Sequence, residues 1–219
     1  MFRDRSDAGR RLAKSLLSYG DRRPVVLALP RGGVPVGFEV ARALHAPLDL
    51  VLVRKLGAPH WEELAIGAVA EGEPPERVLN EDVVHSLRVS PEYLETATET
   101  ARREIERRRA AWLAGRAPID LHGRTAIVVD DGIATGATMR AALRATRRRG
   151  PEQVVLAVPV AAPHALAELR AEADACVCLE TPVDFEAVGQ FYVRFPQLDD
   201  EDVTKLLAQS AAFAPAAGH

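Results

Sequence analysis

The stretch that decides the fold is AIVVDDGIATGATM, residues 126–139. Residues 125–129 form an apolar run, which is typical of a strand buried in a sheet. Successive side chains of a strand point to opposite faces, so Asp130 and Asp131 cannot both lie inside it without burying one carboxylate unpaired. We therefore expect the acid pair where the strand ends and the chain turns, before a helix that ends at residue 149.

The residues after this strand have the chemistry of a ribose 5-phosphate site. Carboxylates accept hydrogen bonds, so Asp130 and Asp131 suit the hydroxyl groups of a ribose. The next residues begin a helix, where free backbone N–H groups and the positive end of the helix dipole bind phosphate. Gly136 is expected to leave the space that the phosphate needs. The candidate phosphate cradle consists of Ala134, Thr135, Gly136, Ala137 and Thr138.

An acid pair before a glycine also occurs as a plain helix cap or turn, and that interpretation stays open for the pair taken alone. Other phosphate loops are excluded. The sequence contains no GxxxxGK[ST] loop, and no GxGxxG follows the first expected strand.

Apolar runs and helical patterns alternate through the rest of the chain. This alternation predicts an α/β fold with a mainly parallel, doubly wound sheet and helices on both faces. The expected strands are 25–29, 48–53, 125–129, 154–160 and 175–179, and the expected helices are 7–18, 36–44, 91–113, the one ending at 149, and 163–171.

Two basic motifs follow the first two expected strands. The first is Leu29-Pro30-Arg31-Gly32-Gly33-Val34, whose glycines let backbone amides approach an anion closely. The second is Arg54-Lys55, which ends the second apolar run.

Taken together, these motifs resemble those of the type I phosphoribosyltransferases, over residues 24–180. The strand, the acid pair and the sequence ATGAT resemble the family's motif for 5-phosphoribosyl-1-pyrophosphate (PRPP). The RGG loop resembles the pyrophosphate loop of the xanthine-guanine branch, in which a cis peptide is common. Arg54-Lys55 is similar to the Arg-Lys pair of the adenine and orotate enzymes. One departure is Ala134, because the 6-oxopurine enzymes place an acid there.

The resemblance implies a pentosyltransferase of nucleotide metabolism that transfers ribose 5-phosphate from PRPP to a nitrogen acceptor, such as a nucleobase, and releases pyrophosphate. Arg31 and Asp130 would follow neighbouring strands whose connections leave in opposite directions, so the motifs would share one crevice. Asp130 and Asp131 would hold the ribose, and residues 134–138 the 5-phosphate. The implied pyrophosphate ligands are Arg31, Gly32, Gly33, Arg54 and Lys55, and the candidate catalytic residues are Arg31, Lys55, Asp130 and Asp131.

The resemblance also implies a cofactor. Mg²⁺ would enter with PRPP and lie near the acid pair, and the protein alone would form no metal site. Among the scattered histidines and the two cysteines, no metal-ligand spacing is present.

The chain ends lie outside the resemblance. We expect one domain over residues 1–213, with a core over 24–180, a hood from 1–20 and 182–213, and a flexible tail over 214–219. The region 56–90 is expected to be irregular around one short strand at 65–70, and its part 57–80 to contain the mobile catalytic loop. In the hood, Phe191 or Tyr192 is expected to stack on a planar acceptor, or else to seal the sheet edge or a dimer contact.

Composition narrows the partners. The chain has 219 residues, a formal net charge of −3 and a pI of about 6.1, so it has no basic field for nucleic acid. The charged start and the absence of long apolar runs predict a cytoplasmic protein with no membrane partner. We expect a homodimer that binds PRPP and a small-molecule acceptor.

Two other functions stay open. One is a PRPP-sensing regulator that keeps the site without turnover, because a fold does not fix a function. The other is a ribose-phosphate or nucleotide hydrolase that uses Asp130 and Asp131 as metal ligands. The hydrolase leaves the RGG loop and Arg54-Lys55 without a role.

Overall fold

A five-stranded parallel sheet forms the centre of the molecule, with the strand order β2-β1-β6-β7-β8. The structure is a computed structural model that describes residues 1–72, 74–113 and 115–213. The predicted tail, 214–219, lies outside the described residues. The strands are β1 (Pro24–Ala28), β2 (Leu48–Leu50), β6 (Thr125–Val129), β7 (Gln153–Val160) and β8 (Ala175–Glu180).

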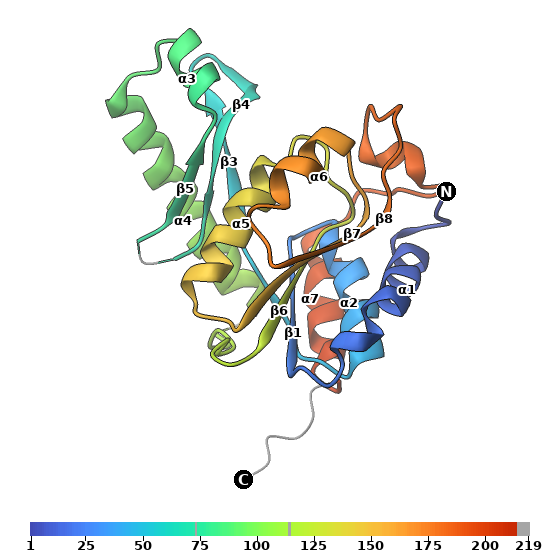
Figure 1. Cartoon of the computed structure of the whole chain (residues 1–219). Helices are drawn as coiled ribbons and strands as arrows, with labels where there is room; N and C mark the ends of the chain where they lie inside the picture. Colours follow the sequence, from blue (N-terminus) through green and yellow to red (C-terminus); the bar gives the residue numbers. More distant parts are fainter. Residues whose placement is uncertain (73, 114, 214–219) are drawn as a thin grey trace.

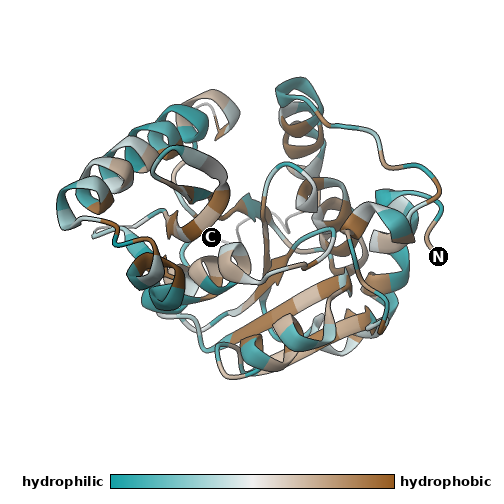
Figure 2. Cartoon of the chain, turned by 90° about the horizontal axis from the view of Figure 1, so that it is seen from above, coloured by the Kyte–Doolittle hydropathy of each residue, from teal (hydrophilic) through white to brown (hydrophobic). Residues whose placement is uncertain are grey.

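Helices cover both faces of this sheet, which confirms the predicted doubly wound architecture (Figure 1). The side chains of each strand alternate between two cores. Val26 and Ile127 pack with α1, α2 and α7, whereas Leu27 and Val128 pack with α5 and α6. Figure 2 shows the apolar strands enclosed between helices whose outer sides are hydrophilic. The helices are α1 (Arg5–Leu16), α2 (Gly33–Leu44), α5 (Ala137–Arg148), α6 (Pro163–Leu169) and α7 (Asp200–Ser210).

Strands β1 and β6 are neighbours in parallel register, with Ala28 opposite Val129. After β1 the chain turns to one side of the sheet to form β2, and after β6 it turns to the other side to form β7. This is the topological switch point at which open α/β sheets bind ligands, beyond the carboxyl ends of the strands. It also brings the RGG loop and the acid pair to the same edge.

A second, antiparallel sheet rises from the first, in the order β3-β4-β5 (Figure 1). The prediction of an irregular segment over 56–90 is therefore wrong for much of that region. Pro59 and His60 form the short turn of a hairpin rather than breaking the structure, and Gly67 lies so close to the Val78 carbonyl that a Cβ atom there would overlap it. The elements are β3 (Val53–Ala58), β4 (Trp61–Ala70), β5 (Glu76–Leu79), α3 (Glu81–Ser86) and α4 (Pro91–Leu113).

The first residues of the chain meet the segment around Tyr192 beside the carboxyl edge of the central sheet (Figure 1). Helices α1 and α7, which the predicted hood also includes, pack instead in the core on one face of that sheet, for example through Leu12 and Val203. Phe2 and Tyr192 form a β-bridge, and their ring centroids lie 5.4 Å apart. Short 3₁₀ turns occur at Leu17–Tyr19 and at Val188–Phe191. None of the helices in the described ranges has the length and apolar character needed to span a membrane.

Candidate active site

Asp130 and Asp131 lie at the carboxyl end of β6, where the sequence predicts them. The Asp130 carboxylate accepts a hydrogen bond from the backbone N–H of Asp131, at 2.8 Å. The segment after the pair is held against β7, because the N–H of Ile133 donates to the Val160 carbonyl at 3.0 Å. The strand therefore delivers both acids to the switch point, and the following loop leads from them to α5.

The RGG loop packs directly on the acid pair. A Cβ atom at Gly32 would overlap the carboxylate of Asp131, and one at Gly33 would lie 2.6 Å from the Val129 carbonyl and 2.9 Å from Cα of Asp130. These contacts give a physical reason for both glycines, since no side chain fits between the loop and the end of β6. The expected cis peptide is present, between Pro30 and Arg31.

Helix α5 begins six residues after Asp131 with its first turn uncapped by any side chain. Its first backbone N–H groups are therefore available to an anion at the positive end of the helix dipole. Ala134 and Thr135 are exposed, and Ala137 and Thr138 are half-buried. Gly136 has φ +81°, a left-handed conformation that favours glycine. A Cβ atom there would meet Leu169 and Ala165 of α6 at 3.4 and 3.5 Å, so the glycine serves the turn rather than keeping phosphate space open as expected.

The side chain of Arg31 turns toward the C-terminal part of the chain. Its Nη1 donates to the Leu198 carbonyl at 2.9 Å, and its Nε lies 3.1 Å from Oδ1 of Asp200. Both side chains of this ion pair remain nearly half exposed. Arg31 therefore sits at the sheet edge beside the acid pair, with Asp200 as its carboxylate partner.

Arg54 and Lys55 lie on β3, and the pairing register separates them. Lys55 is opposite Ala68, whose side chain packs against α5. Arg54 is opposite Val69, which belongs to the core on the other face. Because directly opposed residues share a face of the sheet, Lys55 lies on the face of α5 and Arg54 on the face of α4.

Arg5 is a site residue that sequence reasoning missed. Its Nε lies 2.7 Å from Oδ2 of Asp131, and both side chains are almost fully buried. The hydroxyl of Tyr192 also donates to the backbone carbonyl of Asp131, at 2.6 Å. The signal for Arg5 is weak in the sequence, because 126 positions separate the two partners.

Electrostatics distinguish the two acids. Burial raises the pKa of Asp130 well above its usual range, and the neighbouring Asp131 carboxylate raises it further. Burial also raises the pKa of Asp131, while the hydrogen bond from Arg5 opposes that rise. The arrangement therefore favours a charged Asp131 beside an Asp130 that binds a proton readily.

The sequence profile of the family described as "Phosphoribosyl transferase domain" matches residues 3–195. The chain belongs to this family. The match spans the acid pair, the RGG loop, Arg5 and most of the hood. It confirms the resemblance drawn from the motifs and, with the sheet topology, the type I phosphoribosyltransferase fold.

Relatives of known sequence or structure agree with this assignment. The Mycobacterium tuberculosis (strain ATCC 25618 / H37Rv) protein named "Putative phosphoribosyl transferase Rv0571c" is 48% identical over 207 residues, which are 94% of this chain and 46% of that protein. The chain thus spans about half the length of this curated relative. The crystal structure of TT1426 from Thermus thermophilus is 45% identical, has a TM-score of 0.80, and is matched over 98% of this chain and 99% of that one. A uracil phosphoribosyltransferase from Nocardioides sp. (strain ATCC BAA-499 / JS614) is 38% identical over 81 residues, 37% of each protein.

The aromatic residues of the hood differ in how open they are. Tyr192 is 6% exposed, and its ring packs near those of Phe2 and Phe195, with ring centroids 5.4 and 4.9 Å away. Phe191 is half-buried and packs on Phe185 at 5.2 Å. Tyr192 therefore belongs to the packing of the segment predicted to form a hood, and Phe191 keeps the more open ring.

The described residues fit a magnesium ion that arrives with its substrate. They contain no group of three or more histidine, cysteine, aspartate or glutamate side chains able to hold a metal. The acid pair supplies two carboxylates, and one oxygen of Asp131 is already bound by Arg5. Two oxygen ligands suit Mg²⁺ only when phosphate oxygens and water complete its octahedron.

Proposed function

We propose that this chain transfers the 5-phosphoribosyl group of PRPP to a nitrogen acceptor and releases pyrophosphate. The observation that supports this most is the packing of Gly32 and Gly33 on the acid pair, directly before the uncapped start of α5. A pyrophosphate-binding loop, two carboxylates that bind the ribose hydroxyls and a phosphate-binding helix start then lie along the carboxyl edge of one sheet. These are the parts that PRPP requires, in the order in which its own groups are joined.

Each group of PRPP is assigned to its own residues. The ribose hydroxyls donate to the carboxylates of Asp130 and Asp131. The 5-phosphate binds the N–H groups and hydroxyls of residues 134–138. The pyrophosphate binds the amides of Gly32 and Gly33 and the cations of Arg31 and Lys55. Arg54 is assigned to pyrophosphate as well, although the β3 register favours Lys55 of the two.

The reaction breaks the bond between the anomeric carbon and the pyrophosphate oxygen and forms a bond from that carbon to the acceptor nitrogen. Positive charge develops on the ribose ring, and negative charge grows on the leaving group. The planar guanidinium of Arg31 can donate two parallel hydrogen bonds to pyrophosphate, and the ammonium of Lys55 adds a compact positive charge. Both therefore stabilise the negative charge on the leaving group. Mg²⁺ bound to PRPP would neutralise the pyrophosphate further.

The acceptor is assigned to the hood, residues 183–196. Its half-buried aromatic ring at Phe191 can stack on a planar base. One partial relative is named a uracil phosphoribosyltransferase, and we carry the class of acceptor named there, a nucleobase, to this chain as a hypothesis. A homodimer and a cytoplasmic location remain part of the proposal.

Turnover of PRPP tests the function against its two rivals. The purified chain would be incubated with Mg²⁺, PRPP labelled in the ribose, and one acceptor at a time from a panel of nucleobases, ammonia and simple amines. Release of pyrophosphate that depends on an acceptor, with the label in a nucleotide product, supports the transferase. Tight PRPP binding without turnover supports the sensor. In a parallel assay without PRPP, release of free phosphate from ribose 5-phosphate or from nucleotides supports the hydrolase.

A further inference from the structure

Arg5 is the first residue of α1, and its guanidinium is buried among three groups of the site. It contacts the Asp131 carboxylate through Nε, donates from Nη1 to the Pro196 carbonyl at 2.8 Å, and stacks over the ring of Phe195, with its guanidinium carbon 3.7 Å from the ring centroid. A buried guanidinium is costly unless it is paired and hydrogen-bonded. The three contacts therefore fix both the position and the plane of the group.

The contact with Arg5 leaves the Asp131 carboxylate with one occupied and one available oxygen. Arg5 binds Oδ2 and leaves Oδ1 to other partners, and a side-chain hydrogen bond links this carboxyl group to that of Asp130. The main chain at this position is fixed separately, because Tyr192 binds the Asp131 carbonyl and Gly32 lies against the carboxylate. With the backbone held and Oδ2 bound, the direction of Oδ1 is set.

Arg5 also sets the charge of the acid pair. Asp130 and Asp131 are adjacent, and two ionised carboxylates at such a distance repel each other strongly in a partly buried site. The guanidinium offsets this repulsion by stabilising the ionised form of Asp131, while Asp130 binds a proton readily. Asp131 therefore keeps the charge with which it accepts bonds from hydroxyl groups.

We propose that Arg5 is a positioning residue of the ribose site, which orients Asp131 so that its free oxygen meets the ribose diol. This inference rests on the proposed function, because it concerns the diol that PRPP would bring. Arg5 touches no part of the substrate in this assignment. It acts through Asp131, and through Phe195 and Pro196 it joins the hood to the same carboxylate.

The planar fork of arginine is needed for this role. Nε binds the carboxylate while Nη1 binds a carbonyl of a different segment, so two donors act at a fixed angle. A lysine ammonium at the end of the same stem can pair with Asp131 but has no second donor in that plane, and it stacks less well on Phe195. Arg5→Lys should therefore keep the charge and lose part of the orientation.

The test compares Arg5→Gln and Arg5→Lys with Arg10→Gln as the matched control. Arg10 lies on the same helix and also forms an ion pair, with Glu39 at 3.2 Å, away from the acid pair. Calorimetry on each folded protein would give dissociation constants for ribose 5-phosphate, PRPP with Mg²⁺, and pyrophosphate with Mg²⁺, and melting temperatures would be recorded in parallel.

We expect ribose 5-phosphate and PRPP to bind about tenfold more weakly to Arg5→Gln, with an intermediate loss in Arg5→Lys. Pyrophosphate should bind both variants within about twofold of the wild type, since its ligands lie on other segments. Arg10→Gln should bind all three ligands normally. A fall in melting temperature alone would not produce this selectivity.

Unchanged ribose 5-phosphate affinity in the Arg5 variants would overturn the inference, as would equal losses for all three ligands. If Arg5→Gln does not fold, Arg5→Lys decides on the same criteria. A wild-type protein that binds neither ribose 5-phosphate nor PRPP would overturn the proposed function together with this inference, whereas a normal wild type with normal variants would overturn the role of Arg5 only.

Discussion

The guanidinium of Arg31 is paired with the carboxylate of Asp200, with Nε 3.1 Å from Oδ1. Asp200 is the first residue of α7, far along the chain from the RGG loop. In the proposed function Arg31 binds pyrophosphate, so Asp200 competes with the substrate for the same cation. An exposed pair of this kind is worth about 0.2–1 kcal/mol, and salt weakens it.

Asp200→Asn should therefore tighten pyrophosphate and PRPP binding by about two- to fivefold at low ionic strength. Glu201→Gln is the control, because it removes the same charge from the first turn of α7. Calorimetry at low and at high salt would measure the difference. Weaker binding in Asp200→Asn would mean that Asp200 orients Arg31 for the substrate rather than competing with it.

Asp130→Asn should stabilise the fold while it removes ribose binding. The pKa of Asp130 is raised in the folded state, so its ionised form costs free energy there. The folded protein then holds a proton that the unfolded chain releases near pH 3.8, and the free energy of unfolding falls as pH rises from that value through the raised pKa. At pH values above the raised pKa, the Asp130→Asn protein should have a free energy of unfolding about 1–3 kcal/mol higher than the wild type.

Thermal unfolding from acidic to mildly alkaline pH would test this prediction, with ribose 5-phosphate affinity measured on the same samples. The exposed Asp21, as Asp21→Asn, is the control and should leave the pH dependence unchanged. A melting temperature of Asp130→Asn below that of the wild type at the alkaline end would contradict the prediction.

Gly136→Ala should weaken 5-phosphate binding and cost about 1–2 kcal/mol of stability, because an L-residue is strained at its φ of +81°. Gly115→Ala is a matched control, since Gly115 has φ +76° and open space around it. The two variants should lose similar stability. Only Gly136→Ala should bind ribose 5-phosphate more weakly, and equal affinities would place the phosphate elsewhere.

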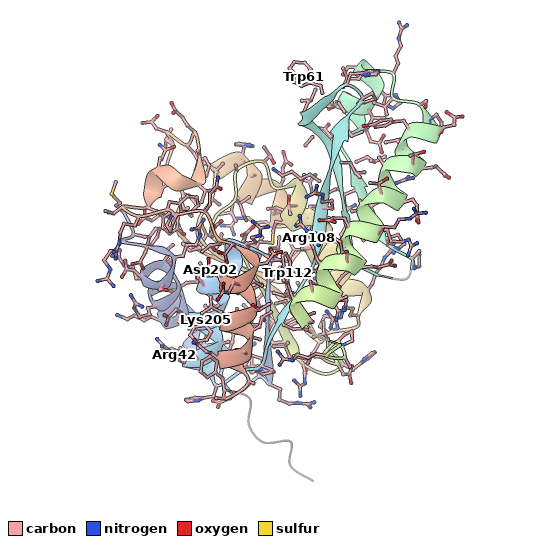
Figure 3. All side chains as sticks on the ribbon, turned by 180° about the vertical axis from the view of Figure 1, so that it is seen from behind. Arg42, Trp61, Arg108, Trp112, Asp202 and Lys205 are labelled. Carbon is pink, nitrogen blue, oxygen red and sulfur yellow. The ribbon has the colours of Figure 1, made fainter. Side chains whose placement is uncertain are left out.

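Lys55→Met should weaken pyrophosphate binding by about fivefold, roughly 1 kcal/mol. Arg54→Met should change it less, because the β3 register turns Arg54 toward α4. Both variants should bind ribose 5-phosphate as the wild type does, since neither residue is assigned to that part of PRPP. The reverse order of losses would show that the hairpin moves relative to α5 when substrate binds. Trp61 marks the tip of this hairpin, well away from the central sheet in Figure 3.

The parts of the site that the sequence predicts are those held within one segment or by one strand pair. Asp130 and Asp131 follow from the end of an apolar strand, and Gly136 from the start of the next helix. The approach of the RGG loop needs only that β1 and β6 be neighbours, which the family resemblance implies. Short-range patterns are sufficient for the acid pair and Gly136, whereas the approach of the RGG loop depends on the resemblance.

The contacts that sequence reasoning missed join segments far apart in the chain. Arg5 meets Asp131, and Arg31 meets Asp200, across 126 and 169 positions, and no local periodicity records such pairs. The hairpin β3–β4 was missed for another reason. Its glycines and prolines are read as breaks, although Gly67 serves close strand pairing and Pro59 a tight turn.

The burial of Tyr192 decides whether this residue has a structural role in the hood or binds the acceptor. Stacking on the acceptor requires an open ring face, but this ring is 6% exposed and packs against Phe2 and Phe195. Burial raises the pKa of its hydroxyl, which is therefore a stable donor to the Asp131 carbonyl at every accessible pH.

We expect Tyr192→Phe to lose about 1 kcal/mol of stability through that bond, with the acceptor KM unchanged. Phe191→Ala should instead raise the acceptor KM and leave PRPP affinity near normal. Steady-state kinetics with the acceptor found in the panel, and melting temperatures for both variants, would measure this contrast. An acceptor KM that rises for Tyr192→Phe and not for Phe191→Ala would require the hood to open and expose Tyr192 when substrate binds.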